Sequence, residues 1–124
     1  MEWRIDSGSP IYAQLLEQLK QRIVTGVYSP GQRIPPVREL AMEAGVNPNT
    51  MQRALGELER EGLVFSQRTS GRLVTDDVQR IETIKQELAD RQIHIFLRTM
   101  ESLGYPPEEV ISLLQAAREK EEKT

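Results

Sequence analysis

One polar stretch near the middle of the chain, GVNPNTMQRAL, carries the side chains with the clearest chemistry. Five of its residues can hydrogen-bond to the edges of nucleic-acid bases or to phosphates: Asn47, Asn49, Thr50, Gln52 and Arg53. The next acid is Glu57, so no carboxylate in this stretch would repel a phosphate. A polar segment without acids is what entry into a DNA groove requires. The structural alternative is that Asn47, Pro48 and Asn49 only start a helix.

The apolar residues around this stretch predict a helix-turn-helix. Asn47 can cap a helix that has Pro48 at its first position and an apolar inner face reaching to Gly62. A shorter helix is predicted over 37–44, with Gly45 as its left-handed stop. Two helices joined by three residues have the spacing of a helix-turn-helix, in which the second helix lies in a major groove.

A predicted hairpin follows the second of these helices. Residues 63–66 and 72–75 are apolar or β-branched enough for two strands, and QRTSGR between them forms a polar tip without acids. We expect Arg68 and Arg72 to reach phosphates or a minor groove as a wing does. The alternative is a solvated turn. Arg38, in the first turn of the shorter helix, could contact a phosphate or guanine, or pair with Glu39 or Glu43.

A first helix and a connector must precede these elements. The apolar spacing from Ile11 to Val24 predicts a helix over about 10–25, which Ser9 can cap and Gly26 ends. The connector from 27 to 36 is rich in proline and has room for one short strand over 32–34. The predicted fold is therefore mainly α, classed as α+β, with a winged helix-turn-helix over residues 1–75.

Residues 76–124 predict two helices that form a dimerisation region. Asp76 and Asp77 suit the start of a long helix that reaches about Leu103, and Gly104-Tyr105-Pro106-Pro107 breaks it. A second helix follows, and the final REKEEKT is expected to fray. The predicted dimer interface consists of Ile81, Ile84, Leu88, Ile95, Phe96, Met100 and Leu103. This seam exceeds what one short helix covers, so a second protomer is expected; the alternative is that it folds back on its own winged helix.

Composition sets limits on other functions. The net charge of −3 divides into +1 for residues 1–75 and −4 for residues 76–124, so the acidity belongs to the tail. The chain has no cysteine and a single histidine, His94, for which a partly buried or interfacial position is expected rather than metal binding, and to which we assign no function. No signal segment or membrane span is recognisable, which predicts a cytoplasmic protein. We expect no cofactor and no enzyme, because the chain lacks a nucleophile–base pair and a phosphate loop, although paired carboxylates remain open.

From residue 11 to residue 74 the sequence resembles the GntR family of bacterial repressors and, within it, the YtrA-like subfamily. The resemblance rests on the IY-Q opening, the G-Y-PG-R-P-RELA segment and the VNPNT-RAL-ELEREG helix. It implies a winged helix fold and a phosphate contact from Tyr12. It also implies DNA-binding roles for Arg38, Asn49, Thr50, Gln52, Arg53 and the wing residues around Gly71, including Ser70.

Two departures from the family pattern bear on affinity. Pro36 stands where a serine is common, and proline can neither cap through a side chain nor donate to a phosphate. The wing, RTSGRLV, is also less basic than the usual RRGKGTFV.

Taken with the resemblance, the sequence predicts a homodimeric repressor of a palindromic operator, with an effector left unidentified. The alternative is a winged helix that serves only as a protein-interaction module.

Overall fold

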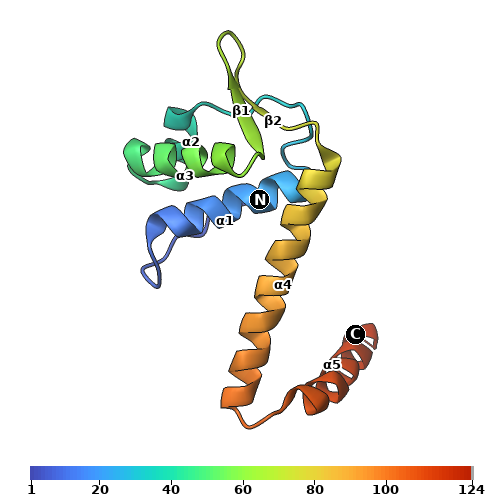
Figure 1. Cartoon of the computed structure of the whole chain (residues 1–124). Coiled ribbons are helices and arrows are strands. Elements are labelled where there is room, and N and C mark those ends of the chain that lie inside the picture. Colours follow the sequence, from blue (N-terminus) through green and yellow to red (C-terminus); the bar gives the residue numbers. More distant parts are fainter. Residues whose placement is uncertain (124) are drawn as a thin grey trace. The chain divides into compact units, whose positions relative to one another are not determined.

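The computed structural model describes residues 1–123 and contains five helices and one hairpin in the order expected of a winged helix with a helical tail (Figure 1). The elements are α1 (Ile11–Val24), α2 (Val37–Ala44), α3 (Pro48–Arg60), β1 (Val64–Gln67), β2 (Gly71–Val74), α4 (Val78–Ser102) and α5 (Pro107–Glu122). The mainly helical fold class predicted from the sequence is confirmed. Within residues 1–123, no helix combines the length and apolarity needed to cross a bilayer.

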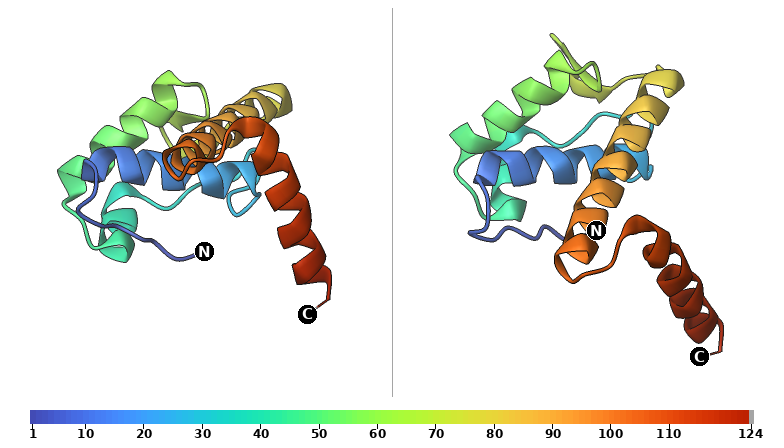
Figure 2. Two further views of the ribbon diagram at one scale, coloured as in Figure 1. Left: turned by 90° about the horizontal axis from the view of Figure 1, so that it is seen from below. Right: turned by 60° about the horizontal axis from the view of Figure 1, so that its bottom comes forward.

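The core of the first compact unit, Met1–Lys85, lies around α3. This helix packs against both α1 and α2 (Figures 1 and 2). Leu15 and Leu19 of α1, Leu40 of α2, and Leu55 and Leu58 of α3 are fully shielded from solvent. Each comes from the apolar stripe of its helix, so the spacing of these leucines determines which face of α3 remains exposed.

The start of α1 differs from the prediction. Ser9 does not cap the helix, because Pro10 occupies the N-cap position and no side chain caps α1. The Ser9 carbonyl instead accepts a hydrogen bond from the Gln14 side chain at 2.8 Å. The end of the helix is as expected, with Gly26 in the left-handed region just beyond it.

The turn between α2 and α3 is fixed by one glycine and one cap. Gly45 has φ 70° and ψ 37°, the left-handed conformation that glycine adopts without steric cost. Two residues later, Asn47 is the N-cap of α3, and its Oδ1 accepts the Asn49 backbone N–H at 2.8 Å. The turn thereby sets where the polar end of α3 begins.

The wing is a two-stranded antiparallel hairpin. Val64 pairs with Val74 and Gln67 with Gly71, so residues 68–70 form the tip and Gly71, at φ 75°, completes a three-residue loop. The predicted strand over 32–34 forms only an isolated bridge, in which Arg33 pairs with Leu73. Its backbone bonds to β2 are short, with Val74 N–H donating to the Gln32 carbonyl at 2.8 Å. Proline at 35 and 36 prevents the pairing from extending.

The amino-terminal turns of α4 belong to the first unit. Asp77 caps this helix, since its Oδ1 accepts the Arg80 N–H at 3.0 Å, as the sequence suggested. Ile81 and Ile84 are buried, with 8% and 1% of their surfaces exposed. The compact units divide after Lys85, whereas the sequence placed the domain boundary after residue 75. The difference arises because Ile81 and Ile84 are buried within the first unit, so the first turns of α4 belong to it.

The second unit, from Gln86 onward, contains the rest of α4 and α5. The turn between them begins with Tyr105 N–H donating to the Met100 carbonyl at 3.0 Å. The segment REKEEKT was expected to fray; its residues 118–122 are helical, because α5 continues to Glu122, and Thr124 lies outside the described residues. Lysine, glutamate and arginine are good helix formers, and Arg118 pairs with Glu122 one turn later at 3.4 Å.

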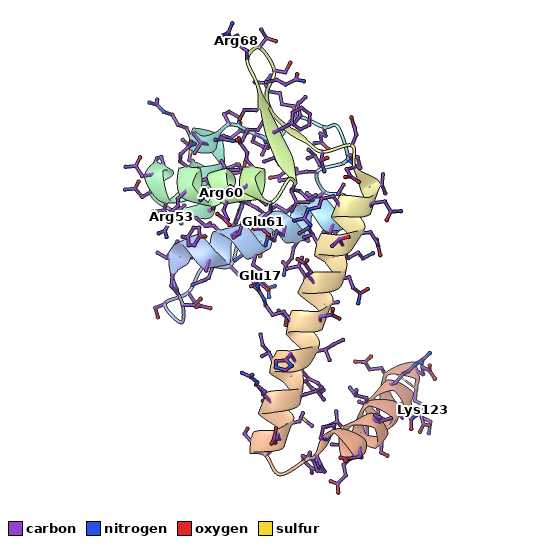
Figure 3. All side chains as sticks on the ribbon, viewed as in Figure 1. Glu17, Arg53, Arg60, Glu61, Arg68 and Lys123 are labelled. Atoms are coloured by element: carbon purple, nitrogen blue, oxygen red, sulfur yellow. The ribbon has the colours of Figure 1, made fainter. Side chains whose placement is uncertain are left out.

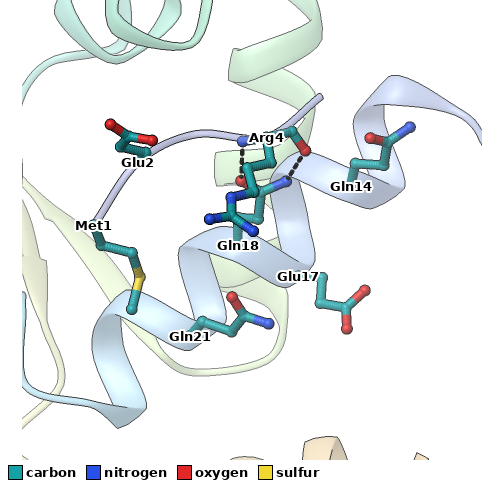
Figure 4. A pocket seen from close by; sticks show the side chains of 7 residues that line it. All are labelled: Met1, Glu2, Arg4, Gln14, Glu17, Gln18 and Gln21. Atoms are coloured by element: carbon teal, nitrogen blue, oxygen red, sulfur yellow. Dashed lines mark hydrogen bonds between the residues drawn. The ribbon is translucent and has the colours of Figure 1, made fainter. Parts of the chain in front are cut away.

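The residues before α1 follow that helix closely. Gln18 binds the Arg4 backbone twice, at 2.9 and 2.8 Å (Figure 4). Gln14 binds the Asp6 backbone in the same way, at 2.9 and 2.8 Å. The guanidinium of Arg22 lies over the Trp3 ring, 3.7 Å from its centroid. Figure 4 shows the hollow beside this segment, which is lined by Met1, Glu2, Arg4 and polar side chains of α1. Pockets for small organic ligands are mostly apolar, so we assign no ligand to it.

Candidate nucleic-acid interface

The amino-terminal end of α3 presents the polar side chains that the sequence singled out. Asn49, Gln52 and Arg53 are exposed and Thr50 is half-buried. Met51, Ala54 and Leu55 of the same helix are buried in the core. Asn47 is also exposed, but its Oδ1 is already bound as the helix cap. The face that remains open is polar and carries no carboxylate before Glu57.

Arg53 does not point straight out from this face. Its guanidinium carbon lies 4.1 Å from the centroid of the Tyr12 ring, at the start of α1. Figure 3 shows Arg53 on the side of α3 that faces α1. The structure therefore brings together two residues that the sequence placed in separate roles.

Arg38 lies on the first turn of α2 and is exposed. The sequence left open whether it pairs with Glu39 or Glu43. Within the described part of the chain, residues 1–123, Arg38 forms no ion pair with either acid. Its guanidinium is consequently accessible to an external anion.

The tip of the wing carries Arg68, which is exposed (Figure 3), and Ser70, which is half-buried. Arg72 lies lower on β2 and is held within the protein. Its Nε donates to Glu59 Oε1 of α3 at 2.8 Å, and the Ser66 hydroxyl of β1 donates to the same oxygen at 2.5 Å. One carboxylate thus joins both strands of the wing to α3. The hydrogen bond from Ser66, together with the hydrogen bond and the charge of Arg72, lowers the pKa of Glu59.

Arg33 is a candidate that sequence reasoning missed. It is exposed, and its Nε lies 3.5 Å from where a Cβ would stand at Gly71. It lines a hollow between the wing and the start of α2 together with Arg72, Gln67 and Pro36. The sequence could have indicated this position. Side chains alternate between the two faces of a strand, so a strand over 32–34 that buries Ile34 turns Arg33 outward.

The predicted dimer residues divide between the two units. Ile81 and Ile84 are buried in the first unit and so are covered within one chain. Ile95, Phe96 and Leu103 are exposed. Leu88 and Met100 are half-buried.

Further apolar residues of the second unit are exposed as well: Ile93, Tyr105, Ile111, Leu113 and Leu114. His94 is exposed among them, and residues 1–123 contain no group of His, Cys, Asp or Glu able to hold a metal ion.

Comparison with known proteins identifies this arrangement. Residues 11–74 match the family described as bacterial regulatory proteins, gntR family. The chain belongs to the GntR family. Members of this family are transcription regulators that bind DNA, so this GntR protein is a DNA-binding transcription regulator and not an enzyme.

Two curated relatives come from Bacillus subtilis (strain 168). The uncharacterized HTH-type transcriptional regulator YhcF is 34% identical over 111 residues, which cover 90% of this chain and 92% of YhcF. The HTH-type transcriptional repressor YtrA is 40% identical over 73 residues, covering 59% of this chain and 56% of YtrA. The GntR protein is thus YtrA-like, as its sequence suggested.

Solved structures show the same fold. A GntR family transcriptional regulator from Listeria monocytogenes superposes with a TM-score of 0.82 at 36% identity, over 90% of this chain and 98% of its own. AraR(DBD) in complex with operator ORX1 superposes with a TM-score of 0.55 at 30% identity, over 60% of this chain and 99% of its own. The second structure therefore shows a relative bound to its operator DNA.

Proposed function

We propose that this GntR regulator binds a palindromic operator as a homodimer and represses transcription. The observation that carries the proposal is the exposed, acid-free end of α3, which stands next to a wing joined to it through Glu59. A repressor among its relatives and an operator complex of another support this function. In a bacterial cell such a protein works in the cytoplasm.

In this proposal the interface makes two kinds of DNA contact, one with base edges and one with phosphates. Asn49, Thr50 and Gln52 read base edges in the major groove, where each bidentate contact discriminates by about 1–3 kcal/mol. Tyr12, Arg38 and Arg68 bind phosphates and set the register. The full proposed contact surface consists of Tyr12, Arg38, Asn47, Asn49, Thr50, Gln52, Arg53, Arg68, Ser70, Gly71 and Arg72.

The homodimer part of the proposal rests on apolar side chains of the second unit. Ile95, Phe96 and Leu103 are exposed on α4 or just after it, beside half-buried Leu88 and Met100. Exposed apolar side chains that gather in one surface region mark a protein interface. Because Ile81 and Ile84 are buried within one chain, the proposed seam begins at Leu88. A two-fold dimer would place two α3 helices in half-sites about 34–36 Å apart, or a multiple of this.

Selection of bound duplexes from a random DNA pool tests the proposal. The winning duplex is then titrated against a scrambled duplex at two salt concentrations. We expect a palindrome that binds about a thousandfold tighter than the scrambled duplex. Weak binding that is wholly salt-dependent, without any enriched sequence, would contradict sequence-specific function and favour a protein-interaction module.

The proposal includes an effector that changes DNA occupancy. A ligand that binds one arrangement of the dimer more tightly than another would shift the spacing of the two α3 helices. The same titration, repeated with candidate metabolites, measures this directly as a change in operator affinity. Equal affinity with and without every metabolite tested would contradict the effector part alone.

A further inference from the structure

Two side chains from different helices form a pair at one edge of the interface. The guanidinium carbon of Arg53, on α3, lies 4.1 Å from the centroid of the Tyr12 ring, on α1. An arginine held over a tyrosine face at this distance is attracted by the ring quadrupole, and its N–H groups remain free at the edge of the guanidinium plane. Arg53 is exposed and Tyr12 half-buried, so the pair is reachable from solvent.

The helical geometry of α3 separates Arg53 from its neighbour Gln52. Successive residues of an α-helix point about 100° apart. Gln52 shares its side of α3 with Glu59, two turns later, and Glu59 contacts the wing through Ser66 and Arg72. Arg53 lies on the other side, toward α1. The exposed face of α3 therefore has a wing edge and an α1 edge.

These two edges correspond to the two walls of a groove. A helix in a major groove about 12 Å wide has base edges in front of it and a phosphate backbone along each side. The wing approaches one backbone. On the opposite side stands the amino end of α1, where no side chain caps the helix and the helix dipole favours an anion.

We propose that Tyr12 and Arg53 form one phosphate-binding site on the α1 edge, in which the Tyr12 ring positions the Arg53 guanidinium. In this arrangement Arg53 binds the DNA backbone and does not read a base. Tyr12 is a positioning residue for Arg53, in addition to any contact of its hydroxyl. The sequence left base edges and phosphates both open for Arg53; this inference selects the phosphate and rests on the proposed operator binding.

The first test compares Arg53→Ala with Gln52→Ala on the selected operator and on its single-base-pair variants. A phosphate contact carries no base information, so we expect Arg53→Ala to weaken all duplexes by the same factor, about tenfold. The slope of log affinity against log salt should fall by about 1. Gln52→Ala should instead relax the preference at particular base pairs. Arg118→Ala removes an exposed arginine from an intrahelical ion pair on α5, outside the proposed DNA contacts, and serves as the control.

The second test asks whether the Tyr12 ring acts through Arg53. Tyr12→Phe keeps the ring and removes the hydroxyl, whereas Tyr12→Leu removes the ring. In double-mutant cycles with Arg53→Ala, we expect a larger coupling energy for Tyr12→Leu than for Tyr12→Phe, because only Tyr12→Leu removes the ring that positions Arg53. Thermal unfolding of each variant reports on folding separately. If Tyr12→Leu does not fold, the comparison of Tyr12→Phe and Arg53→Ala still decides the role of Arg53.

The outcomes separate this inference from the proposed function. Base-specific loss in Arg53→Ala, with an unchanged salt slope, would overturn the phosphate role while operator binding stands. Additive cycles for both Tyr12 variants would overturn the positioning role. A wild-type protein that prefers no duplex would overturn the proposed function and, with it, this inference.

Discussion

At the scale of single residues, Asn47 stabilises α3 through its side chain. Its Oδ1 accepts the Asn49 N–H at 2.8 Å, which satisfies one of the free donors at the start of the helix. We expect Asn47→Ala to lower the free energy of unfolding by about 1 kcal/mol, measured by urea denaturation. Asn47→Ser retains a capping oxygen and is the control. Equal stability of the Ala and Ser variants would contradict the capping role.

Glu59 is the residue that joins the wing to α3. Its pKa is lowered by the hydrogen bond from Ser66 and by the hydrogen bond and charge of Arg72. A carboxylate with a lowered folded-state pKa stabilises the protein above its unfolded pKa of about 4.3, and this stabilisation is lost as the pH falls through the folded value. We expect Glu59→Gln to cost about 1 kcal/mol at neutral pH and progressively less in acid.

Urea denaturation across a pH series checks this prediction. Glu57→Gln on the same helix is the control, because Glu57 forms only a surface pair with Arg60 at 3.2 Å. We expect this control to change stability by less than about 0.5 kcal/mol. A Glu59→Gln effect that stays constant from neutral pH into acid would show that ionisation of Glu59 does not stabilise the wing.

At the scale of elements, the helices were predictable where apolar spacing and end signals agree. For α3, Asn47, Pro48 and Gly62 mark the ends and the leucines mark the inner face. The prediction was wrong for the N-cap of α1, where either Ser9 or Pro10 could stand and Pro10 occupies the position. For residues 118–122 the high charge suggested fraying, whereas their high helix propensity accounts for a helix that continues to Glu122.

The residue types of the candidate interface can be read from the sequence, but the contacts between these residues cannot. The sequence shows that Arg53 and Arg72 are basic and near the polar end of α3. It does not show that one lies over Tyr12 or that the other is bound to Glu59. Such contacts depend on how α1, α3 and the wing pack, and sequence spacing reports only on neighbours within one element.

The start of α4 is an element-scale anchor for the DNA-binding unit. Ile84 has 1% of its surface exposed, so Ile84→Ala should remove buried contacts and lower the free energy of unfolding by about 2–4 kcal/mol. Val78→Ala, in the first turn of the same helix at 66% exposure, is the control and should change stability little. Urea denaturation at one protein concentration makes the comparison. A small effect of Ile84→Ala would mean that α4 does not anchor there.

At the scale of the whole molecule, the proposed homodimer would depend on the apolar seam that begins at Leu88. We expect the double variant Leu88→Glu, Ile95→Glu to be monomeric by light scattering, because charges at an apolar interface are costly to bury. Met42→Glu is the matched control, since Met42 is 82% exposed but lies on α2. An unchanged mass for the double variant would contradict the seam.

The central claim is that the exposed end of α3 reads operator bases. The most direct measurement is the affinity of wild type and Gln52→Ala for the selected operator and for a scrambled duplex, at one salt concentration. We expect the variant to lose about 1–3 kcal/mol of operator binding while its affinity for the scrambled duplex and its unfolding midpoint stay unchanged. Full operator affinity in the variant would contradict the claim.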